Sequence, residues 1–175
     1  MRRLILLRHA KSAWPDGVSD LDRPLAERGR DAAPRMGRYL AEENLLPDLV
    51  LVSPARRTQE TWDLVRAAIG DADTRTEPRI YEAPSARLLA VVKEVPASVR
   101  TLLMIGHNPG FADLSKHLVG HGDRYAFARL TQKYPTAGLA IIDFPVEDWT
   151  EAAGGQGRLD RFVTPKTLGA DRDDD

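Results

Sequence analysis

The sequence predicts an α/β fold, a three-layer α/β/α sandwich with helices on both faces of a mainly parallel central sheet. Three short, unbroken apolar runs carry this prediction: residues 4–7, 49–52 and 101–105. Strands that are buried on both faces read as continuous apolar runs rather than as alternating patterns. A segment with helical periodicity follows each run, and strands that alternate with helices favour parallel pairing.

The first predicted strand leads into a loop and then into a long helix. Residues 11–24 are rich in Asp, Pro, Gly and Ser, which is typical of a loop. Residues 25–43 carry apolar side chains at helical spacing. Pro34 lies inside this run, so we expect it to kink the helix or to mark a helix start.

The later elements follow from similar local signals. Ser53-Pro54, directly after the second apolar run, is a helix-start signature with Ser as the N-cap, and the helix should end near Ile69. Residues 79–82 are expected to form a short strand, and the third apolar run leads into a tight loop over residues 106–110. The remaining predictions are helices over 86–95 and 111–119, strands over 138–144 and 159–163, and a turn at 154–157.

The composition is that of a globular protein with balanced charge. The 175 residues include 42% hydrophobic and 29% charged residues, which suits a single domain. We expect that domain to span residues 1–168 and the acidic tail, residues 169–175, to fray. The formal net charge is −1, which argues against nonspecific binding to nucleic acid or to an anionic membrane. Any basic site must therefore be local.

Several classes of site are excluded or disfavoured by what the sequence lacks. It contains no cysteine, which rules out disulfides, thiolate catalysis and Cys-based zinc sites. Asp16, Asp20 and Asp22 lack the glycine and closing glutamate of a calcium loop, and no nucleotide fingerprint is present, so we predict no metal and no cofactor. The apolar runs are too short for a signal-peptide core or a membrane span, so we expect a cytoplasmic protein.

Basic and imidazole side chains directly follow the three apolar runs. Arg8 and His9 follow the first, Arg56 and Arg57 the second, and His107 the third. Because the carboxyl ends of parallel strands meet at one edge of a sheet, these side chains can converge there. Guanidinium forks match phosphoryl oxygens, and helix amino ends add free N–H groups. The sequence therefore predicts a phosphate site at this edge.

Each of these signals has an ordinary structural explanation when it is taken alone. An Arg-His pair occurs by chance in many proteins, two arginines in a helix usually form a solvated face, and His107 could be a turn residue. Their equivalent positions after three strands make the joint functional reading stronger. His117, within a short helix, and His121, between two glycines, are interpreted as structural or exposed.

The motifs resemble those of the histidine phosphatase superfamily, also called phosphoglycerate mutase-like. Arg8-His9-Ala10 after an apolar strand resembles its opening motif, and alanine in the third place is typical of the SixA branch of phosphohistidine phosphatases. Residues 22–29, 53–61 and 105–110 resemble three further family segments in the family order. Counted from the serine of the second of these segments, the phosphate-binding arginine of the family matches Arg57 rather than Arg56. The resemblance spans roughly residues 3–165 and implies a phosphoglycerate mutase-like fold.

The resemblance also implies a mechanism. His9 would be the nucleophile that forms a covalent phosphohistidine, while Arg8, Arg57 and His107 hold the phosphoryl oxygens and make a metal unnecessary. Glu82 is the natural candidate for the proton donor, although SixA-like proteins often lack a clear equivalent. Ser12 and Asn108, beside these motifs, complete the candidate substrate ligands.

We therefore expect a metal-independent phosphatase, foremost a SixA-type protein phosphohistidine phosphatase whose partner is a phosphorylated phosphotransfer domain. The connections are short, the longest being 11–24 and 120–136, so an open cleft should admit a side chain of another protein. Trp14 is expected either at the rim of this cleft or in the core. The alternatives are a phosphatase for a small metabolite, such as a sugar phosphate or nucleotide, and a phosphate-binding regulatory module.

Overall fold

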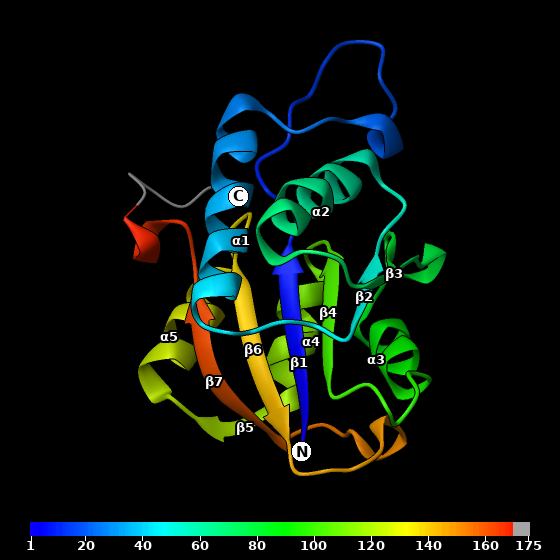
Figure 1. The fold of residues 1–175 in the computed structure, drawn as a ribbon, viewed down its shortest axis with the longest axis vertical. Helices are drawn as coiled ribbons and strands as arrows, with labels where there is room; N and C mark the ends of the chain where they lie inside the picture. The colour runs from blue at the N-terminus through cyan, green and yellow to red at the C-terminus, as the bar shows by residue number, and fades with distance from the viewer. Residues whose placement is uncertain (170–175) are drawn as a thin grey trace.

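A seven-stranded mixed sheet lies at the centre of the computed structural model, which describes residues 1–169 (Figure 1). The strand order is β3-β2-β4-β1-β6-β7-β5. The strands are β1 (Arg2–Arg8), β2 (Leu49–Val52), β3 (Asp73–Thr76), β4 (Thr101–Gly106), β5 (Val119–Gly122), β6 (Leu139–Phe144) and β7 (Gly157–Val163).

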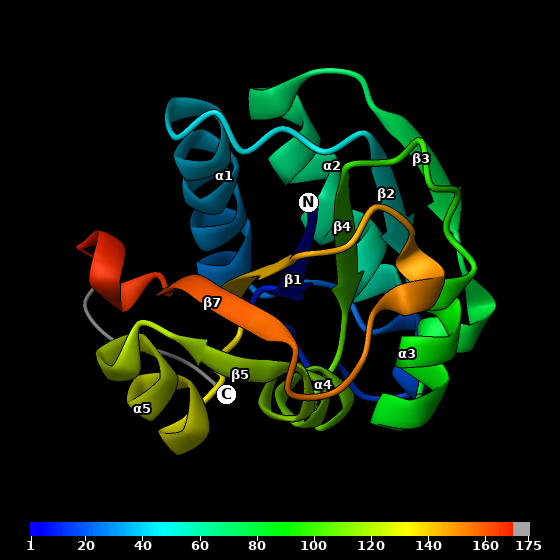
Figure 2. The same cartoon turned by 90° about the horizontal axis from the view of Figure 1, so that it is seen from below.

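Helices cover both faces of this sheet, as predicted (Figures 1 and 2). Helices α1 and α2 pack on one face and α3, α4 and α5 on the other, and each face has its own apolar cluster. The helices are α1 (Glu27–Glu42), α2 (Arg56–Ile69), α3 (Ser85–Lys93), α4 (Gly110–Leu118) and α5 (Arg124–Gln132). The three-layer α/β/α sandwich is therefore confirmed.

The strand pairing brings the predicted site segments together. Strands β3, β2, β4 and β1 are parallel neighbours, whereas β6 runs antiparallel to both β1 and β7. Beyond the last paired residues, the His9 N–H donates to the Gly106 carbonyl at 3.0 Å and the Ser53 N–H donates to the Ile105 carbonyl at 3.1 Å. The segments that follow β1, β2 and β4 therefore leave the sheet side by side.

Strand β1 shows why the central strands read as unbroken apolar runs. Leu4 and Leu6 pack into the cluster under α3 and α4, whereas Ile5 and Leu7 pack into the cluster under α1 and α2. All four side chains are fully buried. Because neither face of the strand meets water, polar residues are absent from both.

One of the two alternatives for Pro34 is excluded, and the prediction of a Ser53 cap is wrong. Pro34 lies inside α1, which begins seven residues earlier at Glu27, so it does not mark a helix start. Helix α2 begins at Arg56 with Ala55 as its N-cap, so Ser53 does not cap it. The Ser53 hydroxyl contacts a site histidine instead, as described below.

The predicted strand over residues 79–82 is also wrong. That region contains a 3₁₀ turn, η2 (Pro78–Ile80), and the strand of this region is the polar β3, which precedes it. The connection expected over residues 120–136 contains β5 and α5. The predicted turn at 154–157 does connect β6 to β7.

The acidic tail was predicted to fray from residue 169, and residues 170–175 lie outside the described part of the chain. Among the helices of residues 1–169, none combines the length and apolar character needed to cross a membrane.

Candidate active site

A pocket of about 190 Å³ opens at the edge of the sheet where β1, β2 and β4 end. It brings together six of the seven predicted site residues, while Glu82 does not line it. The lining residues are Arg8, His9, Lys11, Ser12, Trp14, Arg23, Arg57, His107 and Asn108. The sequence did not single out Lys11 or Arg23.

His9 is held as a buried, neutral imidazole. Only 6% of the residue is exposed, and its Nδ1 lies 2.8 Å from the Ala10 carbonyl oxygen. A carbonyl can only accept, so Nδ1 carries the proton and Nε2 keeps its lone pair. Burial lowers the pKa of His9 well below its usual value, and the positive charges of Arg8 and Arg57 lower it further, against the opposing effect of the Ala10 bond.

His107 faces His9 from the end of β4. The two ring centroids are 5.4 Å apart. His107 Nε2 lies 2.7 Å from the Ser53 hydroxyl, while its buried Nδ1 has no hydrogen-bond partner among the described residues. Burial, followed by the nearby Arg57 charge, lowers the pKa of His107 to about 3. Its ring is therefore neutral near pH 7.

The structure distinguishes between the two neighbouring arginines of α2. Arg57 is buried and lines the pocket. Arg56 is exposed and its Nε pairs with Glu60 at 3.1 Å, one helical turn along the same helix. Because successive helical residues point in different directions, only one of the pair can face the pocket. The alignment of Arg57 with the family arginine agrees with this placement.

Asp20 connects three segments around the pocket. Its carbonyl accepts from Arg57 NH1 at 2.7 Å, and its carboxylate accepts from Arg57 NH2 at 3.2 Å. The same carboxylate accepts from the Tyr81 hydroxyl at 2.5 Å and from Arg23 NH1 at 3.0 Å. The Tyr81 bond, followed by the arginines, lowers the pKa of Asp20 to about 2 against the effect of burial. An ionised Asp20 thus fixes the position of Arg57.

Sequence reasoning considered Asp20 only as a possible cation ligand, and it did not single out Tyr81. The Tyr81 ring meets the His107 ring edge-on at 5.6 Å between centroids. Within residues 1–169, no group of three or more His, Asp or Glu side chains is arranged to hold a metal ion, and the lack of a metal stays a prediction.

Arg8 and Asn108 share an acceptor. Arg8 NH1 donates to the Tyr134 carbonyl at 3.0 Å, and the Asn108 amide donates to the same oxygen at 2.8 Å. Asn108 also accepts from the Ala112 N–H at 3.2 Å, near the start of α4. Its side chain therefore joins two backbone segments, which gives it a structural function in addition to its place in the pocket wall.

The remaining two candidates are placed differently. Ser12 lies in the pocket wall, where its hydroxyl accepts from Arg23 NH2 at 2.5 Å. Glu82 is exposed and has a left-handed backbone, with φ of 54°. Its carboxylate lies beside the Tyr81 hydroxyl, whose pKa is raised by burial, then by Asp20 and then by Glu82. Glu82 is thus near the site but outside the pocket wall.

Trp14 lies at the rim of the pocket rather than in the core. It is 77% exposed, and the Arg23 guanidinium carbon lies 3.2 Å from the centroid of its ring. Of the two positions left open by the sequence, the rim is therefore the observed one.

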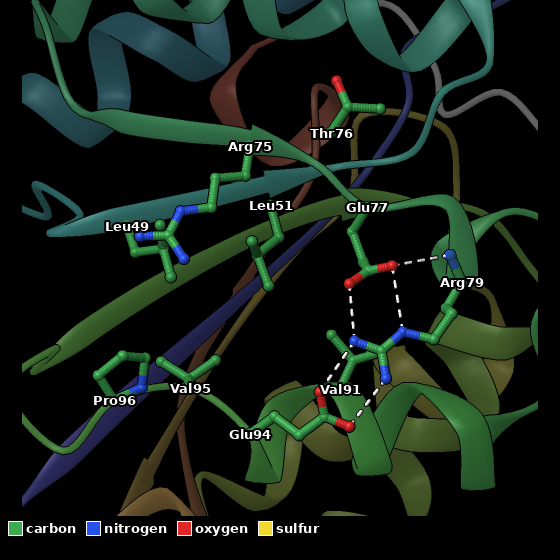
Figure 3. Close-up of a pocket in the computed structure, with 10 residues that line it drawn as sticks. All are labelled: Leu49, Leu51, Arg75, Thr76, Glu77, Arg79, Val91, Glu94, Val95 and Pro96. Carbon is green, nitrogen blue, oxygen red and sulfur yellow. Dashed lines mark hydrogen bonds and ion pairs between the residues drawn. The ribbon is translucent and has the colours of Figure 1, made fainter.

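A second cavity, of about 170 Å³, lies between β2, β3 and α3 (Figure 3). Its Arg79 is paired with Glu77 at 2.8 Å and with Glu94 at 2.8 Å. Figure 3 shows both carboxylates directed at the same guanidinium. Two carboxylates on one cation leave no net positive charge to attract a phosphoryl group, in contrast to the pocket around His9.

Comparisons with known proteins agree with this geometry. The model of the histidine phosphatase superfamily (branch 1) matches residues 4–85. An uncharacterized protein of Mycobacterium tuberculosis is 35% identical over 162 residues, which are 91% of this chain and 100% of that protein. A structure from Agrobacterium tumefaciens, named as a candidate phosphohistidine phosphatase SixA, is 30% identical with a TM-score of 0.81 and covers 94% of this chain and 98% of its own.

The chain belongs to the histidine phosphatase superfamily. A second candidate SixA structure, from Nakamurella multipartitia, is 28% identical to this histidine phosphatase family member, with a TM-score of 0.83 over 94% of this chain and 96% of its own. The fold is therefore phosphoglycerate mutase-like, as the sequence motifs implied. Members of this superfamily are phosphatases, and the basic residues around His9 are suited to hold a phosphoryl group.

Proposed function

We propose that this protein is a phosphatase that hydrolyses phosphohistidine in another protein, through a covalent phosphohistidine intermediate on His9 and without a metal ion. We further propose that residues 1–168 act as one catalytic domain. The single observation that carries the proposal is the His9 ring, buried and neutral, with Nδ1 tied to the Ala10 carbonyl and Nε2 left as a nucleophile.

The first step is attack of the His9 Nε2 lone pair on phosphorus. The new N–P bond forms as the bond from phosphorus to the leaving group breaks, and the leaving group departs with the bonding pair. An imidazole that is already protonated on its other ring nitrogen leaves as a neutral molecule, whereas an alkoxide takes up a proton from an acid. Arg8, Arg57 and His107 hold the phosphoryl oxygens in line, and this positioning with charge neutralisation is the main source of catalysis in phosphoryl transfer.

In the second step, water attacks the phosphorus of the intermediate. The N–P bond breaks, inorganic phosphate leaves and His9 Nε2 regains its lone pair. The proton stays on Nδ1, which donates to the Ala10 carbonyl throughout, so His9 begins each cycle in the same tautomer. Asp20 acts as a positioning residue because it holds two nitrogens of Arg57 and leaves the other N–H groups of that guanidinium for the phosphoryl oxygens.

The position of Glu82 favours phosphohistidine over a phosphate ester. An alkoxide leaving group needs a proton donor within hydrogen-bond reach, which typically contributes about 10²–10⁴-fold to the rate. Glu82 is exposed and does not line the pocket. Protonated imidazole leaves as a neutral molecule, so a distant acid slows its departure little. We propose that Glu82 serves as proton donor only for the ester reaction.

The size of the pocket supports the same choice. Its volume is about 190 Å³, below the range of roughly 300–1,000 Å³ that is typical of sites that enclose a whole small molecule. A phosphoryl group and one ring fill such a pocket, and the rest of the substrate must lie outside it. A nucleotide or another ester larger than one ring would gain few further contacts inside.

Covalent labelling tests the proposal. We expect a brief incubation with a ³²P-labelled phosphohistidine protein to leave acid-labile, alkali-stable label on the enzyme, and we expect His9→Ala to abolish that label. His121→Ala, at an exposed histidine on β5, is the matched control and should label normally. Label that persists in His9→Ala would move the nucleophile to another residue. Tight tungstate binding with neither label nor turnover would identify a phosphate-binding module, and preference for a sugar phosphate or nucleotide would identify a metabolite phosphatase.

A further inference from the structure

The loop that follows β1 presents apolar side chains to solvent beside the pocket. In residues 1–169, six large hydrophobic side chains are exposed, and three of them belong to this one loop: Trp14 at 77%, Leu21 at 41% and Val18 at 39%. In Figure 1 this dark blue loop extends beyond the carboxyl end of β1, away from the body of the sheet. Exposed apolar residues concentrated in one segment beside a binding pocket are candidates for an interaction surface.

Trp14 is held in place by Arg23. The guanidinium carbon of Arg23 lies 3.2 Å from the centroid of the indole ring. Arg23 is itself buried and makes three hydrogen bonds, to the Ala13 carbonyl at 3.1 Å, to Asp20 at 3.0 Å and to the Ser12 hydroxyl at 2.5 Å. A rigid aromatic side chain loses little conformational entropy when a partner covers it.

The base of the loop is also fixed. The Ala13 N–H donates to the Pro24 carbonyl at 2.9 Å, and Ser12 forms an antiparallel bridge with Leu25. Asp20, at the far side of the loop, is bonded to Arg57 in the pocket wall. The two ends of the loop are therefore joined to each other, and Asp20 joins the loop to the pocket wall.

We infer that Trp14, Val18 and Leu21 form a docking surface for the apolar face of a folded protein, around the side chain whose phosphoryl group enters the pocket. The inference rests on the proposed function and specifies its partner. Trp14 lines the pocket, whereas Val18 and Leu21 do not. A ligand that contacts all three must therefore extend out of the pocket and over the loop, which a small phosphate ester does not do.

The charges of the loop select among large partners. Asp16 and Asp22 are exposed carboxylates between and beside the apolar residues. They repel the phosphates of an anionic membrane or a nucleic acid. They complement basic residues at the edge of an apolar protein surface, which corresponds to the arrangement of an apolar interface centre with a charged rim.

Selectivity between two phosphohistidine substrates tests the docking surface. The first substrate is a histidine phosphotransfer domain phosphorylated on its histidine, and the second is free phosphohistidine, which can fill the pocket but cannot reach the loop. The measured quantity is the ratio of kcat/KM for the domain to kcat/KM for the free amino acid. We expect Trp14→Ala and the double variant Val18→Ser/Leu21→Ser each to lower this ratio at least tenfold, mainly through KM for the domain.

The matched control is Tyr125→Ala, because Tyr125 is 76% exposed and lies on α5, away from the loop. Its ratio should stay within twofold of that of the original protein. An unchanged ratio in both loop variants would overturn the docking surface while the proposed function stands, and so would equal losses on both substrates. If the original protein hydrolyses neither phosphohistidine substrate, the proposed function itself fails. The double variant replaces only exposed side chains, so folding is preserved where Trp14→Ala is unstable.

Discussion

Acidification is expected to destabilise the folded protein through the two buried site histidines. The pKa of His107 is lowered to about 3, and the pKa of His9 is also lowered well below 6.5, chiefly because both rings are buried. In the unfolded chain each ring takes up a proton as the pH falls through about 6.5. The folded protein does not take up these protons, so its stability is complete above pH 6.5 and declines below that value.

The size of the decline follows from the pH interval. Each pH unit between the unfolded pKa and the folded pKa reduces the free energy of unfolding by about 1.4 kcal/mol per histidine. For His107, the 1.5 units from pH 6.5 to pH 5 give a loss of about 2 kcal/mol, and His9 adds a loss of the same sign. The pKa of Asp20 is about 2, so its contribution is lost only below about pH 4 and does not overlap this interval.

Urea unfolding at pH 7 and at pH 5 measures this effect. In His107→Asn, the difference between the two pH values should be smaller than in the original protein by about 2 kcal/mol. His121→Asn, at an exposed position, should leave the difference unchanged. The comparison is insensitive to packing lost in the variant, because that loss is the same at both pH values. An equal difference in His107→Asn and the original protein would refute the assignment of a neutral, buried His107.

Three further predictions concern the arginines of α2, the proton donor and a glycine of α1 that lies against the backbone of Lys11. Arg57→Ala should lower kcat/KM by about 10²–10³-fold, whereas Arg56→Ala should stay within twofold, and similar losses in steady-state assays would contradict the choice between them. Glu82→Gln should slow hydrolysis of an alkyl phosphate such as glycerol phosphate more than hydrolysis of phosphohistidine, and equal slowing would count against its proposed restriction to esters. Gly29→Ala should lower the free energy of unfolding by about 3 kcal/mol, because a Cβ there would lie 2.1 Å from the Lys11 carbonyl oxygen. Unfolding by urea at pH 7 measures this loss, and a change under about 1 kcal/mol would contradict the prediction.

The central strands could be predicted from the sequence because burial on both faces leaves an unmistakable local pattern. Strands β1, β2, β4 and β6 have fully buried or nearly fully buried interiors. The edge strands have no such pattern. Asp73–Thr76 of β3 and Val119–Gly122 of β5 are mostly exposed and join the sheet mainly through backbone pairing. Backbone pairing depends on a neighbouring strand, which a local pattern does not record.

The short helix α5 was missed for a related reason. It has nine residues, of which only Ala126 and Leu130 are buried. Two apolar positions spaced by one turn are too few to define a helical period. Helix α5 packs against β7, and the Asp123 side chain accepts from the Ala126 N–H at 3.0 Å. These contacts stabilise a helix that its sequence alone does not specify.

For the site too, positions near strand ends could be predicted, whereas contacts between residues far apart in the sequence could not. Arg8, His9, Arg57 and His107 could be predicted to converge because each lies at or shortly after the end of a strand, and the sheet fixes where strands end. The contacts of Asp20 could not be predicted, since 37 residues separate it from Arg57 and 61 residues separate it from Tyr81. Those contacts exist only because the loop after β1 folds back over the pocket.

The residues that hold the phosphoryl group and those that meet the rest of the substrate lie in different parts of the fold. The groups that hold a phosphoryl group follow the strand ends, so any chain with this sheet can keep the same chemistry. The side chains that meet the rest of the substrate, Trp14, Val18 and Leu21, lie in a loop whose position depends on Arg23 and its bonds to Ser12 and Asp20. A loop tolerates change more readily than a strand, so substrate preference can alter while the residues that hold the phosphoryl group stay constant. Exchange of this loop between family members should therefore transfer substrate preference, measured as the ratio of kcat/KM values for two substrates, without removing the covalent intermediate on His9.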